Sequence, residues 1–283
     1  MEQRVTIQNK ELTVEISSLG AEIKSVKKDG VQMMWSGDPA VWDGVAPILF
    51  PICGSLKEDK YQYEGREYTL SKHGFVKYTL FEVESQSQEQ VVFVTRSNEK
   101  TRESYPFDFE FRVAFRLSGS TLSVEYGVKN CGRELYFSLG AHEAYACPEG
   151  IEEYALLFDQ EETFDSTRLE GSLIREDTIR VSEPSRLLPL KESYFKEDTL
   201  VFQQLKSRKV TLAHQNSSKK ITLSFPGHDY FMVWHKPGGR YICLEPWCGL
   251  PDEVGSSYDF TRKKGIIRLT DEAVYSHQIT FEL

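Results

Sequence analysis

The run Tyr241–Trp247 is apolar except for one carboxylate, Glu245, which is followed by Pro246 and Trp247. An ionised carboxylate is costly to remove from water, so a chain that buries one usually satisfies it or uses it in chemistry. Because Pro246 has no N–H to give to a sheet, we expect Glu245 at the end of a strand, where a pocket can open. Trp247 would provide a flat apolar wall. A second proton-handling group facing Glu245 would complete an acid/base site.

His142 is the strongest candidate for that second group. It ends the sequence Tyr-Phe-Ser-Leu-Gly-Ala-His, residues 136–142. On a strand it would share a face with Gly140, which leaves space beside the imidazole. Imidazole titrates near neutrality, so His142 can give or take a proton at cytosolic pH. The alternative is a buried histidine whose ring is satisfied by a backbone carbonyl.

Two further polar residues are weaker candidates by themselves. His73 lies between two aromatic β segments, beside Gly74, which permits close backbone approach. Asp198 lies just before the apolar run Leu200–Phe202, where it is either an ordinary turn acid or an acceptor for a ligand hydroxyl.

The elements that must position these residues are strands. Apolar and polar residues alternate over residues 107–117 and again over 122–128, and Ser118, Gly119 and Ser120 between them indicate a hairpin turn. No long window has the 3.6-residue period of a helix; residues 38–42 are one candidate for a helical turn. We therefore expect an all-β protein of two packed sheets, forming a single domain over residues 1–283. Residues 168–189 have mixed polarity, and we expect loops and turns there.

Charge and composition exclude several classes of partner. The formal net charge is −9, from 43 acidic and 34 basic residues, with no cationic block. Nucleic acid and anionic membrane surfaces would repel such a chain. The N-terminal residues have no apolar signal core, so the expected location is cytoplasmic.

The sequence gives little support for metal, nucleotide or serine-hydrolase chemistry. The five cysteines show no C-x-x-C spacing; Cys243 and Cys248 could in principle hold zinc with histidines, but close ligand pairs are missing. The dinucleotide fingerprint, the Walker loop, the H-E-x-x-H zinc helix and the nucleophile elbow are absent. We expect no metal and no cofactor.

Four short motifs occur in a characteristic order: K-H-G-F at His73, S-L-G-A-H at His142, E-D-T-L-V-F at Asp198 and I-C-L-E-P-W at Glu245. This order and spacing resemble the aldose 1-epimerases (mutarotases), most closely their LacX-like bacterial branch, over nearly the whole chain. The resemblance implies a large twisted antiparallel β-sandwich, the galactose mutarotase-like supersandwich, with few short helices and a sugar in an open cleft.

The resemblance also implies roles for the four residues. Glu245 matches the general base that takes the proton from the anomeric hydroxyl, and His142 matches the general acid that protonates the ring oxygen. His73 matches a second histidine near the ring oxygen. Asp198 matches an acid that holds sugar hydroxyls.

One position departs from the family pattern. Many relatives carry an arginine that touches the sugar where this chain has Ser55. Lys57 or Lys77 could substitute, but an ammonium does not reproduce the guanidinium fork. We include Ser55, Lys57 and Trp247 among the expected substrate contacts. The missing arginine argues against a sugar phosphate as substrate.

These observations predict a cofactor-independent mutarotase that acts on a small-molecule sugar. A glycosidase with Asp198 and Glu245 as paired carboxylates is one rival, because such pairs lie roughly 5–5.5 or 6.5–9.5 Å apart. A non-catalytic sugar-binding protein of the same fold is another, and so is an epimerase of a different sugar or a sugar phosphate. Galactose, glucose and other aldoses or ketoses present the same chemistry, and both the sugar and the oligomeric state stay open.

Overall fold

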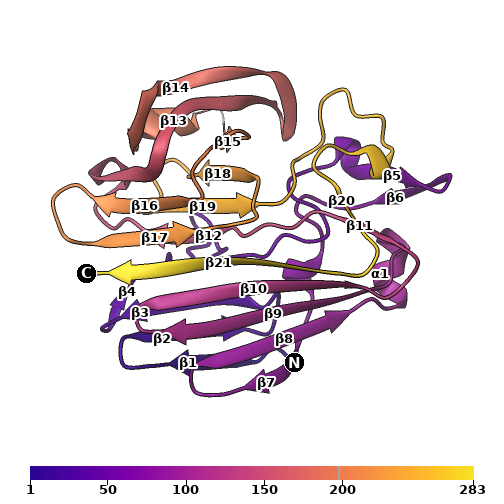
Figure 1. The fold of residues 1–283 in the computed structure, drawn as a ribbon, viewed down its shortest axis with the longest axis horizontal. Coiled ribbons are helices and arrows are strands. Elements are labelled where there is room, and N and C mark those ends of the chain that lie inside the picture. Colours follow the sequence, from indigo (N-terminus) through magenta and orange to yellow (C-terminus); the bar gives the residue numbers. More distant parts are fainter. Residues whose placement is uncertain (197) are drawn as a thin grey trace.

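The structure, a computed structural model that describes residues 1–196 and 198–283, confirms the expected all-β class. Its largest element is an antiparallel sheet of nine strands (Figure 1). In spatial order these are β14 (Leu173–Pro189), β13 (Tyr154–Glu170), β16 (Lys209–His214), β17 (Lys220–Ser224), β21 (Glu272–Glu282), β10 (Thr121–Asn130), β9 (Phe109–Ser118), β8 (Gln90–Arg96) and β7 (Glu82–Gln86).

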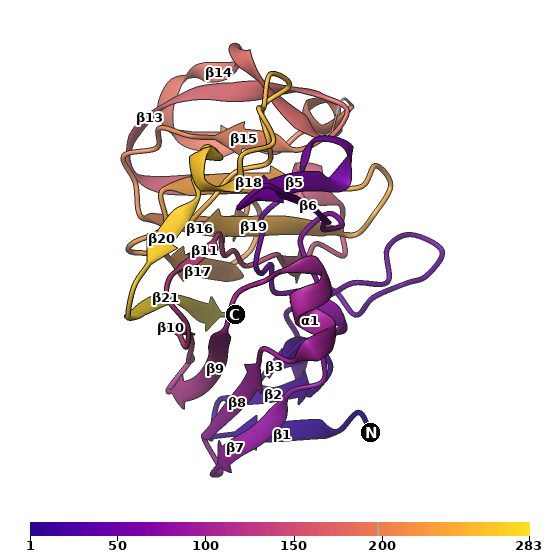
Figure 2. The ribbon, with the colours of Figure 1, turned by 90° about the vertical axis from the view of Figure 1, so that its right-hand side faces the viewer.

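Two four-stranded antiparallel sheets lie beside the large sheet (Figures 1 and 2). The first consists of β1 (Arg4–Gln8), β2 (Leu12–Ser17), β3 (Glu22–Lys28) and β4 (Val31–Gln32). The second consists of β12 (Glu143–Ala146), β19 (Tyr241–Trp247), β18 (Tyr230–Trp234) and β15 (Leu200–Phe202). One continuous apolar core contains side chains from all three sheets, so the expected β-sandwich is confirmed.

Short elements complete the fold. The two-stranded sheets pair β5 (Lys60–Tyr63) with β6 (Arg66–Thr69) and β11 (Leu135–Phe137) with β20 (Ile267–Leu269). The helical segments are α1 (Glu99–Ser104) and the 3-10 turns Lys57–Asp59, Val76–Tyr78, Ile151–Glu153, Glu192–Phe195 and Phe260–Arg262. Among the described residues, no helix has the length and apolar character needed to cross a membrane.

The alternation over residues 107–128 correctly predicts the centre of the large sheet. β9 and β10 form an antiparallel hairpin in which Ser118 pairs with Thr121. The apolar positions of both strands are buried, as a period of two requires when one face packs on the core.

Two local predictions are wrong. Residues 38–42 form a tight turn rather than a helical one, because the N–H of Asp38 donates to the carbonyl of Trp42 at 2.9 Å and closes the loop. Residues 168–189 are mostly β structure: they contain the end of β13 and the whole of β14, two 17-residue strands that pair as a hairpin. Much of β14 is exposed, so the sequence there shows no alternation of apolar and polar residues.

Candidate active site

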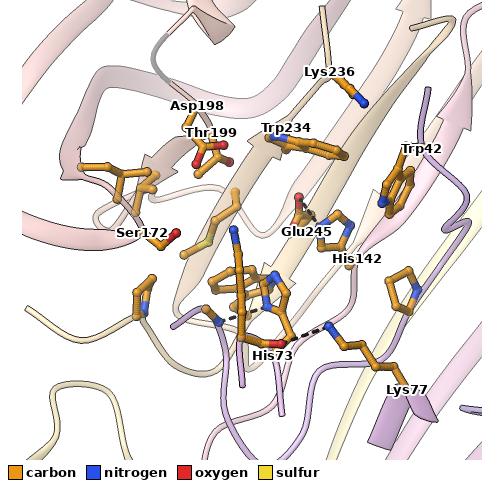
Figure 3. A pocket seen from close by; sticks show the side chains of 18 residues that line it. Trp42, His73, Lys77, His142, Ser172, Asp198, Thr199, Trp234, Lys236 and Glu245 are labelled. Atoms are coloured by element: carbon orange, nitrogen blue, oxygen red, sulfur yellow. Dashed lines mark hydrogen bonds and ion pairs between the residues drawn. The ribbon is translucent and has the colours of Figure 1, made fainter. Parts of the chain in front are cut away.

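One cavity brings together the four motif residues and the tryptophan beside them. It has a volume of about 440 Å³, and its lining includes His73, His142, Asp198, Glu245 and Trp247. Figure 3 shows Glu245 and His142 side by side, with Asp198 and His73 on different sides of them. Segments that are far apart in the chain therefore converge on one site, as the motifs predict.

Glu245 lies on β19, opposite Met232 of β18. Its residue is only 2% exposed, and its Oε1 has no hydrogen-bond partner among the described residues. β19 continues two residues beyond Glu245, further than expected. Pro246 stays in the sheet because its carbonyl accepts the N–H of Ala141 at 3.1 Å. The result is a buried carboxylate whose Oε1 accepts no hydrogen bond from the described residues and can accept one from a ligand.

His142 reaches the same point from the residue before β12. Its Nε2 lies 3.5 Å from Oε1 of Glu245, and its Nδ1 is buried without a hydrogen-bond partner among the residues described. The rings of Trp42 and Trp234 lie against the imidazole, with centroids 5.3 and 5.7 Å away. The imidazole is therefore held by aromatic packing rather than by a backbone carbonyl, the alternative considered from the sequence.

Burial acts on the pKa of both groups. Desolvation raises the pKa of Glu245 well above its usual value, with the charge of Lys72 acting in the opposite direction. Desolvation lowers the pKa of His142 to about 3. A pair of this kind titrates as a unit. With one shared proton it is either carboxylate and imidazolium or carboxylic acid and imidazole, and the total charge is the same in both states.

Trp247 lines the cavity with its indole ring, as expected of an apolar wall. Gly140 makes room for a different side chain from the one predicted. A Cβ at Gly140 would lie 2.5 Å from Cδ1 of Trp247. The glycine therefore leaves room for the indole of Trp247, not for the imidazole of His142. The indole Nε1 donates to the carbonyl of Ala141 at 3.1 Å, which fixes the ring plane. The segment before His142 is not a continuous strand either, because β11 ends at Phe137 and β12 begins at Glu143.

His73 presents a hydrogen-bond donor to the cavity. The backbone N–H of Gly54 donates to its Nδ1 at 3.1 Å, and burial lowers the pKa of His73 well below its usual value. A neutral ring that accepts at Nδ1 carries its proton on Nε2. Its φ is 69°, and a Cβ on the following Gly74 would lie 2.3 Å from the carbonyl oxygen of Phe50. The local backbone is thus held in an unusual conformation that fixes the ring.

Asp198 lines the cavity beside Thr199, whose hydroxyl donates to the carbonyl of Val233 at 3.0 Å. The φ of Asp198 is 145°, a value that residues other than glycine rarely adopt. Such strain tends to occur at binding and catalytic sites. Leu169 and Ser172, at the tip of the β13–β14 hairpin, line the cavity nearby.

Two predicted substrate contacts lie outside the residues that line the cavity. Ser55 is buried, and its carbonyl accepts the N–H of Asp252 at 2.8 Å. Lys57 places its ammonium 5.2 Å from the ring centroid of Tyr258. Lys77, the other suggested substitute for the family arginine, does line the cavity.

Other cavity residues are not among the candidates named from the sequence. Trp42 comes from the turn at residues 38–42, and Trp234 ends β18. Lys72 and Lys236 also line the cavity, together with Ser172 and Thr199. Lys72 belongs to the K-H-G-F motif and Thr199 to the E-D-T-L-V-F motif, so both could have been found there. The others reach the site through the packing of turns and strands that are far apart in the sequence.

One group of side chains could hold a metal ion. Among the described residues, ligand atoms of His142, Cys243 and Glu245 lie within 4.8 Å of one another. A cysteine binds zinc as the thiolate, whereas burial raises the pKa of the Cys243 thiol well above its usual value. Cys248, the other cysteine considered for zinc, instead donates to the carbonyl of Gly227 at 3.5 Å. That the site works without metal stays a prediction.

Comparisons with known proteins agree with this geometry. A protein-family model described as aldose 1-epimerase matches residues 3–281. The plasmid-encoded protein LacX of Lactococcus lactis subsp. lactis is 35% identical over 265 residues, covering 87% of this chain and 88% of that protein. A solved galactose mutarotase related enzyme from Lactobacillus acidophilus is 30% identical, with a TM-score of 0.93 over 99% of this chain and 98% of its own. A galactose mutarotase-like protein from Lactobacillus casei is 27% identical, with a TM-score of 0.94 over 99% and 100% of the two chains.

Proposed function

Because this chain belongs to the aldose 1-epimerase family, we propose that it is a mutarotase that interconverts the α and β anomers of a hexose. The observation that carries the proposal is the contact between Oε1 of Glu245 and Nε2 of His142, 3.5 Å apart on the wall of the cavity. Both atoms can exchange a proton with a sugar placed against them.

The reaction needs two proton transfers at neighbouring oxygens. Glu245 takes the proton of the anomeric hydroxyl O1 while His142 gives a proton to the ring oxygen O5. The C1–O5 bond breaks and C1 becomes a carbonyl carbon. Rotation about C1–C2 and the reverse transfers close the ring as the other anomer. Atoms and electrons balance without an oxidant, a reductant or a covalent intermediate.

Burial by itself favours the neutral form of the pair, with Glu245 as carboxylic acid and His142 as imidazole. The proton therefore has to pass from Glu245 to His142 before the ring opens. Before ring opening the pair is carboxylate and imidazolium, and afterwards it is carboxylic acid and imidazole. The site therefore keeps the same charge throughout, and no new charge is desolvated during the step. Each positioned acid or base contributes roughly 10²–10⁴-fold to the rate. His73 would donate from Nε2 to the sugar, and Asp198 would accept from its hydroxyls.

The test is the rate of anomer exchange. Freshly dissolved α-D-galactose and α-D-glucose should reach anomeric equilibrium faster with the protein than in buffer, as followed by polarimetry or NMR. Binding of these and other sugars measured by calorimetry, with no acceleration of any of them, would instead favour a sugar-binding protein.

A further inference from the structure

The cavity carries an excess of basic groups in a chain that is acidic as a whole. Lys72, Lys77 and Lys236 all line it, although the formal net charge of the protein is −9. Among the described residues of its lining, the acids are Asp198 and Glu245, and burial raises the pKa of Glu245 well above its usual value. A neutral hexose has no negative charge that three lysines in the cavity lining could bind.

In the described part of the chain, these lysines lack the acidic partners that some other lysines have. Across residues 1–196 and 198–283, no carboxylate forms an ion pair with any of the three, whereas Lys28 pairs with Glu11 and the buried Lys263 pairs with Asp252 at 3.2 Å. An ammonium has three donors. Lys77 uses one on the carbonyl of Lys72 at 3.0 Å, and Lys236 uses one on the carbonyl of Val41. Donors are left over for a ligand.

Lys72 and Lys77 lie on either side of His73 in the chain and act on the catalytic pair. Burial, and then the charges of both lysines, lower the pKa of His142. Burial also lowers the pKa of Lys77, so an anionic partner would favour its charged form. In Figure 3, Lys77 lies on the His73 side of the pair and Lys236 on the Trp234 side.

We propose, building on the mutarotase function above, that the substrate is an aldose with an anionic group, a phosphate or a carboxylate, which Lys72 and Lys77 bind. The anionic group cannot be on C1, because ring opening needs a free anomeric hydroxyl. Sugar 6-phosphates and uronic acids both carry their anionic group at C6, so we place it there. The missing arginine at Ser55 argues against such a substrate from sequence alone. The structure places Ser55 outside the cavity lining and supplies cations from another segment. Lysine binds phosphate as a point charge.

The experiment compares substrates that differ only at C6. Anomer exchange is measured by NMR for glucose and galactose, for their 6-phosphates and for glucuronate and galacturonate, each corrected for its own uncatalysed rate. We expect kcat/KM of one anionic class to exceed that of the neutral hexose by roughly ten- to hundredfold, the size of a hydrogen bond to a charged group. Which class is preferred identifies the anion as phosphate or carboxylate.

Matched variants locate the effect. Lys72→Gln and Lys77→Gln should lower kcat/KM for the anionic sugar roughly tenfold or more and for the neutral hexose much less. Lys100→Gln removes the same charge from an exposed position of α1, outside the cavity, and should change neither rate.

The outcomes separate this inference from the function on which it rests. Equal or better turnover of the neutral hexoses, or an equal loss for both sugar classes in the lysine variants, would overturn the anionic substrate and leave the mutarotase standing. No acceleration of any sugar would overturn both.

Discussion

At the scale of single residues, the site is built from groups that oppose folding. Glu245 and His142 are both buried, and each has a polar atom without a hydrogen-bond partner in the described part of the chain. An unsatisfied buried polar atom costs about 1–3 kcal/mol. Residues that are retained at such a cost are often functional, and removing the charge should therefore stabilise the fold while it abolishes activity.

Glu245→Gln tests this directly. The pKa of Glu245 is raised in the folded state above its ordinary value of 4.5, so its protonated form is favoured by folding. That contribution is present below the ordinary pKa and is lost as the pH rises through the folded-state pKa. We expect the variant to be more stable than wild type by about 1–3 kcal/mol at pH 8 and by less at pH 5, in denaturant unfolding.

The exposed Glu103 of α1 provides the control, because Glu103→Gln should leave the free energy of unfolding within about 0.5 kcal/mol at both pH values. A Glu245→Gln protein that is less stable than wild type at pH 8 would contradict the assignment of a destabilising buried carboxylate.

The residues that the sequence identifies are those that lie in short motifs. His73, His142, Asp198 and Glu245 each stand in such a motif, and all four line one cavity. Trp42 and Lys236 could not be found in this way, because a lone aromatic or basic residue reaches the site only when its loop packs there. The family resemblance predicts a sugar contact at Ser55 from a single position, whereas the packing of its loop places Ser55 outside the cavity lining.

At the scale of elements, the β13–β14 hairpin brings its tip to the cavity. Ile174 is fully buried just after that tip. Its N–H donates to the carbonyl of Asp252 at 2.9 Å, and its carbonyl accepts the N–H of Val254 at 3.1 Å. The hairpin is therefore anchored beside Leu169 and Ser172, which line the cavity. The sequence missed this hairpin because an exposed strand has no apolar face to show a period of two.

Ile174→Ala should loosen this anchor. Loss of a buried isoleucine side chain costs about 2–5 kcal/mol in the free energy of unfolding, and we expect KM for the sugar to rise as the tip moves. Ile179→Ala, on the same strand but 48% exposed, should stay within about 0.5 kcal/mol of wild type. Equal effects of the two variants on stability and KM would show that the tip is not held through Ile174.

At the scale of the whole molecule, one sheet combines strands from distant parts of the chain. The nine-stranded sheet takes strands from β7 to β21, and the core beneath it also includes side chains of β1 and β2. Strand periodicity predicts this class of fold, but it does not predict the order of strands: β21 pairs with both β10 and β17, which precede it by long stretches of chain. Such long-range pairing depends on tertiary packing rather than on local pattern.

The predicted single domain has a calorimetric consequence. A chain with one shared core should unfold in one cooperative transition, with a calorimetric enthalpy equal to the van't Hoff enthalpy. Differential scanning calorimetry of the full chain measures both. Two separate transitions, or a van't Hoff enthalpy well below the calorimetric one, would show that the sheets unfold as independent units.

The central claim is that Glu245 and His142 act together as base and acid, and anomer exchange in variants of the pair tests it most directly. With the best substrate of the sugar panel, we expect Glu245→Gln and His142→Asn each to lower kcat/KM by roughly 10²–10⁴-fold. The double variant should fall little further, because groups that act as a unit are not additive. A folded Glu245→Gln protein that keeps the wild-type rate would contradict the mechanism.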